Sequence, residues 1–191
     1  MTARKWQPLI VAINFRLLTW LVVAVLWVLL FRLNDFFFEK LAVSALVSWI
    51  FLPAGLRLLS ILVFRRNAVF GLFIGSLITT SNIGMSLENT LIISLISAVN
   101  PYFAYLVSNA LLNIKTSLNS LTTQQLLLLS ITYAMFNAVS HNFYFYFTHI
   151  HDEFFISTLK MFIGDLVGSL VMLYLFSFAI RFIRKGILGE Q

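Results

Sequence analysis

Two ionisable side chains lie inside long apolar stretches, where a charge is expensive to keep. Arg57 falls within the apolar run 41–64, and Asp165 falls within the run 154–183. A charged side chain at membrane depth costs several kcal/mol. Counted from one membrane face at ~1.5 Å per residue, the two differ in depth by roughly 7 Å, which an arginine side chain can span. The sequence therefore predicts a buried Arg57–Asp165 pair that either locks two helices together or binds an anion at Arg57, with Asp165 orienting the guanidinium.

The residues just before Arg57 indicate a broken helix. Pro53 inside a helix frees a carbonyl and bends the axis, and Gly55 allows another backbone to approach. Broken membrane helices often border binding sites, although an ordinary proline kink gives the same pattern. We therefore take Trp49, Pro53 and Gly55, together with Arg57 and Asp165, as candidate ligand-binding or helix-coupling residues.

Two further segments have glycines four residues apart, a spacing that allows close helix packing. One pair is Gly71 and Gly75, and the other is Gly164 and Gly168, which brackets Asp165. We expect the break at 53–55 to pack against the third and sixth apolar helices through these four glycines.

The sequence offers few residues for metal binding or catalysis. The chain has no cysteine, which excludes thiolate metal sites and cysteine nucleophiles. His149 and His151 are expected to be solvated in a loop, because a dedicated metal site needs three or four convergent ligands. No nucleophile–base constellation or glycine-rich phosphate cradle is found. We expect no catalytic residues, no metal and no cofactor, so the protein is not expected to be an enzyme.

The composition requires a membrane protein. Of 191 residues, 60% are hydrophobic and only 10% are charged, whereas soluble domains have about 25% charged residues. A soluble enzyme, a disordered chain and a nucleic-acid-binding module are excluded. Since a helix needs about 20 apolar residues to cross a bilayer, residues 1–191 are interpreted as one all-α, polytopic domain with six transmembrane helices. Their expected ranges are about 9–31, 41–64, 68–82, 90–112, 122–147 and 154–183.

Basic residues set the expected orientation, because they are enriched in cytoplasmic segments. With the N-terminus inside, eight basic residues fall inside and two outside. Both termini are therefore expected in the cytoplasm, and the protein is expected to be multi-pass in a bacterial-type inner membrane. Thr122 and Gln125 predict a capping box for the fifth helix. The inside residues are Arg4, Lys5, Arg65, Arg66, Lys115, Arg181, Arg184 and Lys185, and the outside residues are Arg32 and Lys40.

Two stretches resemble a known family. Residues 49–80 combine a tryptophan, Pro53-Ala54-Gly55, Arg57, a basic turn and spaced glycines, and residues 162–168 contain a Gly-Asp-x-x-Gly pattern. Together they resemble the MASE-type membrane-associated sensor domain family, of the first described type. The resemblance covers residues from about 41 to 183. It implies a membrane sensory input module, here in a stand-alone and shortened form, that acts through a separate kinase or cyclase.

Two alternatives remain open at this stage. The outline is also similar to the substrate-binding S components of energy-coupling-factor transporters, whose partner is a transporter module. A structural or assembly subunit of a larger membrane complex is the third interpretation. In each case the expected partners are the lipid bilayer and another protein rather than nucleic acid, and an oligomer is compatible with all three.

Overall fold

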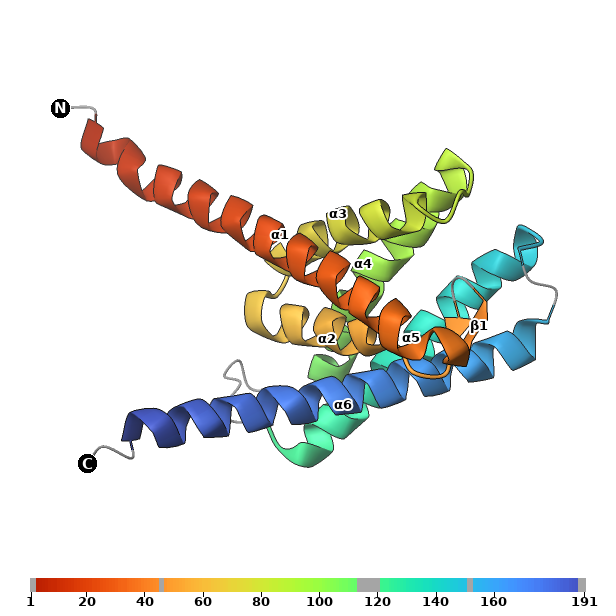
Figure 1. Ribbon diagram of the computed structural model, residues 1–191. Coiled ribbons are helices and arrows are strands. Elements are labelled where there is room, and N and C mark those ends of the chain that lie inside the picture. Colours follow the sequence, from red (N-terminus) through yellow and green to blue (C-terminus); the bar gives the residue numbers. More distant parts are fainter. Residues whose placement is uncertain (1–2, 45–46, 113–120, 151–152, 189–191) are drawn as a thin grey trace.

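The structure, a computed structural model, describes residues 3–44, 47–112, 121–150 and 153–188 (Figure 1). Six α-helices make up nearly all of these residues. A short 3-10 helix, η1 (Glu39–Leu41), and two short antiparallel strands interrupt the chain between the first two helices. The strands are β1 (Ala42–Ser44) and β2 (Val47–Ser48), and the helices are α1 (Ala3–Phe38), α2 (Leu52–Phe64), α3 (Asn67–Ser81), α4 (Leu87–Leu112), α5 (Thr123–Phe147) and α6 (Phe154–Leu188).

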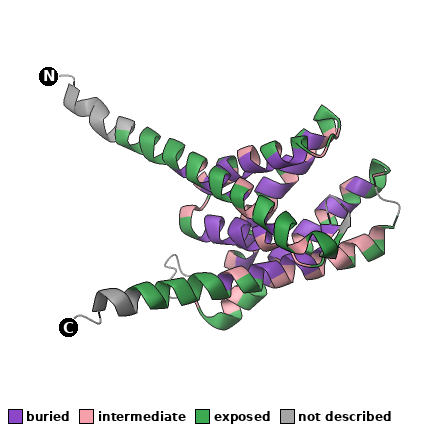
Figure 2. Cartoon of the chain, in the orientation of Figure 1, coloured by how far each residue is buried: buried purple, intermediate pink, exposed green. Residues whose placement is uncertain are grey.

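The short helix α2 is the centre of the bundle. It contacts all five other helices, and every residue from Pro53 to Leu62 is buried. The long helices α1 and α6 flank it, and Figure 2 shows their outer faces exposed while α2 is buried. The side chains of residues 53–62 therefore lie within the protein, whatever surrounds the bundle.

The start of α1 and the end of α6 lie at one end of the bundle, which we call the terminal end, together with the turn between α2 and α3 (Figure 1). The η1–β1–β2 segment and the turns α3–α4 and α5–α6 lie at the opposite end, which we call the hairpin end. The exposed Arg66 lies at the terminal end, and the exposed Glu88 and Glu153 lie at the hairpin end. The side chains of Arg4, Lys5, Lys115, Arg184 and Lys185 lie outside the described residues.

The prediction of one helix over 41–64 is wrong for its first part, because the α-helix begins only at Leu52. The preceding residues form η1, β1 and β2. Pro53 is in the first turn of α2, where its missing N–H costs nothing, so it begins a helix and does not kink one. An apolar composition suits a buried extended segment as well as a helix, and composition alone could not separate the two.

The backbone leading into α2 has its polar groups satisfied by the flanking helices. The Leu52 N–H donates to Asn34 Oδ1 of α1 at 2.9 Å, and the Phe51 N–H donates to the Gly164 carbonyl of α6 at 3.2 Å. Non-helical backbone at membrane depth is tolerated only where protein or a cavity covers it. These two hydrogen bonds provide that cover and fix the segment between α1 and α6.

Gly164 and Gly168 make this crossing possible. A Cβ atom at Gly164 would overlap the Ser48 carbonyl, and one at Gly168 would overlap the Phe51 carbonyl. A Cβ atom at Gly55 would overlap the Cβ of Met172 on α6. The backbone before α2 and the first turns of α2 thus lie directly on α6.

Gly71 and Gly75 do not face the broken segment, and that part of the packing prediction is wrong. A Cβ atom at Gly71 would lie 2.8 Å from the Trp20 carbonyl oxygen, and one at Gly75 would lie 2.8 Å from Trp27 Cβ, both on α1. The four-residue spacing identified a close helix contact. The partner is α1, because the bulky tryptophans of α1 pack closely only against residues that have no side chain.

Helices occupy the other five predicted ranges, with different ends. Among the described residues, Val11–Phe38, Leu87–Leu111 and Phe154–Ile183 are long and apolar enough to cross a membrane. Helices α2 and α3 are apolar but shorter, and α5 has the length but carries buried polar residues. The predicted capping box is confirmed, since Thr122 Oγ1 and Gln125 Oε1 each accept from the other residue's backbone N–H.

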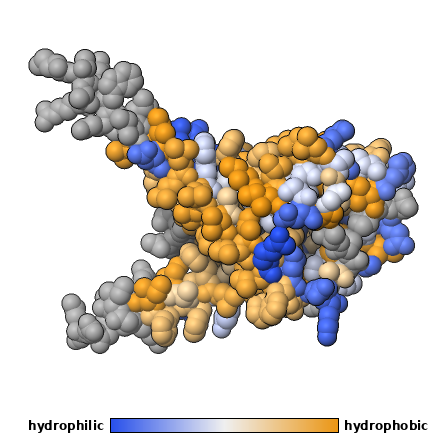
Figure 3. All heavy atoms as spheres, turned by 45° about the horizontal axis from the view of Figure 1, so that its top comes forward, coloured by the Kyte–Doolittle hydropathy of each residue, from blue (hydrophilic) through white to orange (hydrophobic). Residues whose placement is uncertain are grey.

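The bundle surface is strongly apolar. Figure 3 shows apolar side chains over the middle of one face and hydrophilic side chains gathered toward the end opposite the termini. Large exposed apolar areas mark lipid or protein contacts. The exposed side chains include Phe15, Leu18 and Leu21 on α1 and Phe178 and Phe182 on α6.

Candidate functional site

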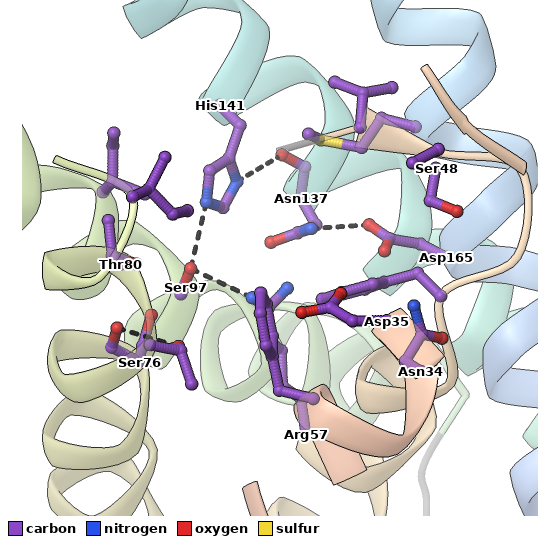
Figure 4. A pocket seen from close by; sticks show the side chains of 18 of the residues that line it. Asn34, Asp35, Ser48, Arg57, Ser76, Thr80, Ser97, Asn137, His141 and Asp165 are labelled. Carbon is purple, nitrogen blue, oxygen red and sulfur yellow. Dashed lines mark hydrogen bonds between the residues drawn. The ribbon is translucent and has the colours of Figure 1, made fainter. Parts of the chain in front are cut away.

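A polar cavity of about 70 Å³ lies inside the half of the bundle nearest the hairpin end. All six helices and the η1–β1–β2 segment contribute to its wall. Figure 4 shows polar side chains from several of these elements pointing toward one another across it. A cavity needs at least ~10–15 Å³ to hold one water, so this one has room for water or a very small solute. Its labelled residues are Asn34, Asp35, Ser48, Arg57, Ser76, Thr80, Ser97, Asn137, His141 and Asp165.

Arg57 projects from α2 into this cavity and is 5% exposed. Its Nη1 donates to Tyr133 Oη at 3.2 Å, and its Nη2 donates to Ser97 Oγ at 3.0 Å. The guanidinium carbon lies 4.5 Å from the Trp27 ring centre and 5.5 Å from that of Phe51. Within the part of the chain that the structure describes, the buried Nε–H has no hydrogen-bond partner. The cation is thus positioned by neutral groups and aromatic faces.

A chain of hydrogen bonds leads from Arg57 to His141. Because Arg57 Nη2 donates to Ser97 Oγ, the serine hydroxyl is free to donate to His141 Nε2, 3.1 Å away. His141 Nδ1 lies 2.9 Å from the Asn137 carbonyl oxygen. A carbonyl can only accept, so the neutral imidazole carries its proton on Nδ1 and uses Nε2 as an acceptor.

Asp165 lies on the α6 side of the cavity and is 2% exposed. Its Oδ2 accepts from Asn137 Nδ2 at 2.5 Å. No direct ion pair joins Asp165 to Arg57, so the predicted direct contact is not formed. The reason is that the aromatic stacking and the two neutral acceptors direct the guanidinium toward α4 and α5. The two charges share one cavity without touching.

The other candidate residues have different positions. Gly55 packs on α6 and Pro53 begins α2, so both shape the wall without offering a polar group. Trp49 is 39% exposed and does not line the cavity. The tryptophan that covers Arg57 is Trp27 of α1, which donates from Nε1 to Thr79 Oγ1 at 3.0 Å.

The predicted site residues did not include the polar side chains that α5 directs toward the cavity. Tyr133, Asn137 and His141 lie four residues apart and are all buried. Positions four apart lie on one helix face, so this spacing is a detectable signal of a polar stripe facing inward. Among the described residues no group of three metal-ligating side chains occurs, while His151 and Asp152 lie outside them.

Ser97→Ala is expected to lower the free energy of unfolding by ~1–3 kcal/mol, because it removes the Arg57 acceptor and the His141 donor together. Ser108→Ala is the matched control on the same helix, since the buried Ser108 hydroxyl has no partner among the residues that the structure describes. Its removal is expected to be neutral or slightly stabilising. Thermal unfolding of both variants in detergent tests this, and equal melting temperatures would contradict the hydrogen-bond chain.

Comparison with protein-family models establishes the family of the chain. The family model MASE1 matches residues 15–190. The chain belongs to the MASE1 family. This confirms the resemblance drawn from residues 49–80 and 162–168, and MASE1 domains are membrane-associated sensory domains. Comparisons with curated proteins and with solved structures gave no match. The polar cavity is therefore a feature of an all-helical membrane sensory domain.

Proposed function

We propose that this MASE1 chain is a sensory module that binds a small solute in the Arg57–Asp165 cavity and signals through a separate protein. The observation that carries the proposal is a nearly buried cation beside an internal space of about 70 Å³, with two of its four Nη N–H groups donating among the described residues. A cation kept without an anionic partner at membrane depth is costly. A ligand that binds the unused N–H donors of Arg57 offsets this cost and gives the site a function. No catalytic step is part of the proposal.

The proposal includes six spans with both termini in the cytoplasm of a bacterial-type inner membrane. The common end of the two termini and the basic turn after α2 support this arrangement (Figure 1). The cavity would then lie nearer the outer surface. A groove lined by Arg32, Asp35, Glu39 and Asn82 shares several wall residues with the cavity, and it would serve as the route from the outside.

Helices α1 and α6 are suited to carry the signal. Trp27 on α1 and Asp165 on α6 both line the cavity, and both helices continue to the terminal end of the bundle (Figure 1). A ligand shifts a conformational equilibrium by binding two states with different affinity. Drawing Asp165 toward α2 would displace α6 relative to α1, and a kinase or cyclase bound at the terminal end would respond.

Single cysteines test the topology, because the chain has no native cysteine. Arg66→Cys and Glu153→Cys replace exposed residues at opposite ends of the bundle. A membrane-impermeant thiol reagent added to intact cells is expected to label Glu153→Cys only, and Arg66→Cys only after the membrane is opened. Labelling of both, or of Arg66→Cys alone, in intact cells would contradict the proposed topology.

Co-purification tests the sensory role itself. The tagged full chain, purified from its native cell in mild detergent, is expected to retain a histidine kinase or a cyclic-dinucleotide enzyme identified by mass spectrometry. Retention of a transporter ATPase module would favour the S-component alternative. Retention of a fixed set of structural subunits would favour an assembly role, and either result would overturn the sensory proposal.

A further inference from the structure

Building on the sensory function proposed above, we propose that the cavity binds a small zwitterionic amino acid, with its carboxylate on Arg57 and its ammonium group on Asp165. The cavity holds one cation and one anion that are both nearly buried and do not pair with each other. A ligand with both charges satisfies both residues at once. A simple anion or a simple cation satisfies only one of them.

The guanidinium has the donors that a carboxylate needs. Of the four N–H groups on Nη1 and Nη2 of Arg57, two donate within the described residues, to Tyr133 and Ser97, and one on each nitrogen is left for a ligand. Trp27 and Phe51 contact the guanidinium and hold its plane. Planar donors in a water-poor site favour a carboxylate, which accepts two parallel hydrogen bonds.

Asp165 has the complementary capacity. Among the described residues, its carboxylate accepts a side-chain hydrogen bond from Asn137 Nδ2 at Oδ2, and an ionised carboxylate offers about four acceptor positions. The Asn137 side chain is itself oriented by Asn100, whose Nδ2 donates to Asn137 Oδ1 at 3.5 Å. An ammonium group carries three donors, and the free acceptor positions of Asp165 and the second lone pair of Ser97 Oγ are available to them.

Charges at the opening favour a zwitterion over an anion. Asp35 and Glu39 line both the cavity and the groove that leads to it, against the single base Arg32 in the groove. An approaching anion meets this excess of acid and is repelled. A molecule with no net charge is not repelled, and its ammonium group is attracted.

Cavity size limits the side chain. Because one water takes ~30 Å³ of liquid volume, a cavity of about 70 Å³ admits only the smallest solutes. Glycine, alanine and serine are the smallest α-amino acids, whereas aromatic amino acids are much larger. The inferred ligand class is therefore a small, neutral α-amino acid.

The test is a binding measurement on the purified full chain in lipid nanodiscs. Glycine, L-alanine and L-serine are titrated by calorimetry and by thermal shift, with acetate, ethylammonium and L-phenylalanine as matched probes. At least one small amino acid is expected to bind saturably and about tenfold or more tightly than acetate or ethylammonium, and L-phenylalanine is expected not to bind. Equal weak binding of all probes, binding of acetate alone, or no binding would each overturn the proposal.

Two variants place the ligand in the cavity. Arg57→Gln and Asp165→Asn are each expected to weaken amino-acid binding about tenfold or more. Arg66→Gln and Glu88→Gln remove the same charges from exposed positions and are expected to leave it unchanged. Circular dichroism shows whether the variants fold. If they do not, the probe series on the unaltered chain decides by itself.

The same measurements separate this inference from the sensory proposal. Amino-acid binding by a chain that retains only a transporter module would support the ligand and overturn the sensor. Retention of a kinase or cyclase by a chain that binds no amino acid would support the sensor and overturn the ligand.

Discussion

Gly168→Leu is expected to abolish most of the folded protein. A Cβ atom at this position would overlap the Phe51 carbonyl and lie 3.0 Å from the Leu52 nitrogen. That backbone cannot retreat, because Asn34 and Gly164 hold it by hydrogen bonds. Overpacking of a core typically costs ~1–3 kcal/mol, and a clash with fixed backbone is expected to reach or exceed the upper value.

Thermal unfolding and the monodisperse fraction in detergent measure this effect. Val171→Ala is the control on the same helix, since Val171 is 39% exposed and faces outward. It is expected to leave both quantities nearly unchanged. An unchanged melting temperature for Gly168→Leu would show that α6 does not pack on the segment before α2.

Arg57→Ala and Asp165→Ala are each expected to lower the free energy of unfolding by ~1–3 kcal/mol, because each leaves the buried hydrogen-bond partners of the lost side chain unsatisfied. The double variant Arg57→Ala with Asp165→Ala is expected to lose slightly less than the sum of the two single losses. Since the two groups make no direct ion pair, the expected coupling energy is only about 1 kcal/mol. The melting temperatures of the four proteins complete a double-mutant cycle.

Exposed charges give the control for this cycle. Arg66→Ala and Glu88→Ala at opposite ends of the bundle are expected to change stability by less than about 0.5 kcal/mol. Strictly additive losses in the Arg57 and Asp165 cycle would mean that the two charges do not interact.

Sequence patterns predicted the parts of this fold that depend on composition and local spacing. Apolar runs gave the helical class, and the Thr122–Gln125 spacing gave the capping box. The cost of charge at membrane depth singled out Arg57 and Asp165, which the structure places in one cavity. Each of these features depends on a property that a short window of residues carries by itself.

The remaining features depend on which element lies opposite. Trp49 and Trp27 both occur in apolar surroundings, and only the packing of α1 on α3 puts Trp27 beside Arg57. The glycine spacing in α3 indicates a close helix contact, but it does not show whether the partner is α1 or α2. The non-helical segment before α2 is stabilised by Asn34 and Gly164 from distant parts of the chain, and no local pattern contains that information.

Thiol accessibility inside the cavity tests the central claim most directly. Thr80→Cys places a single thiol on the cavity wall, where Thr80 is 5% exposed, and Met135→Cys places one at a position 50% exposed on the apolar surface of α5. A small water-soluble methanethiosulfonate reagent added from outside intact cells is expected to modify Thr80→Cys and not Met135→Cys, and saturating glycine is expected to slow the reaction. No modification of Thr80→Cys from outside, or modification only from the cytoplasmic side, would contradict a water-accessible ligand cavity open toward the hairpin end.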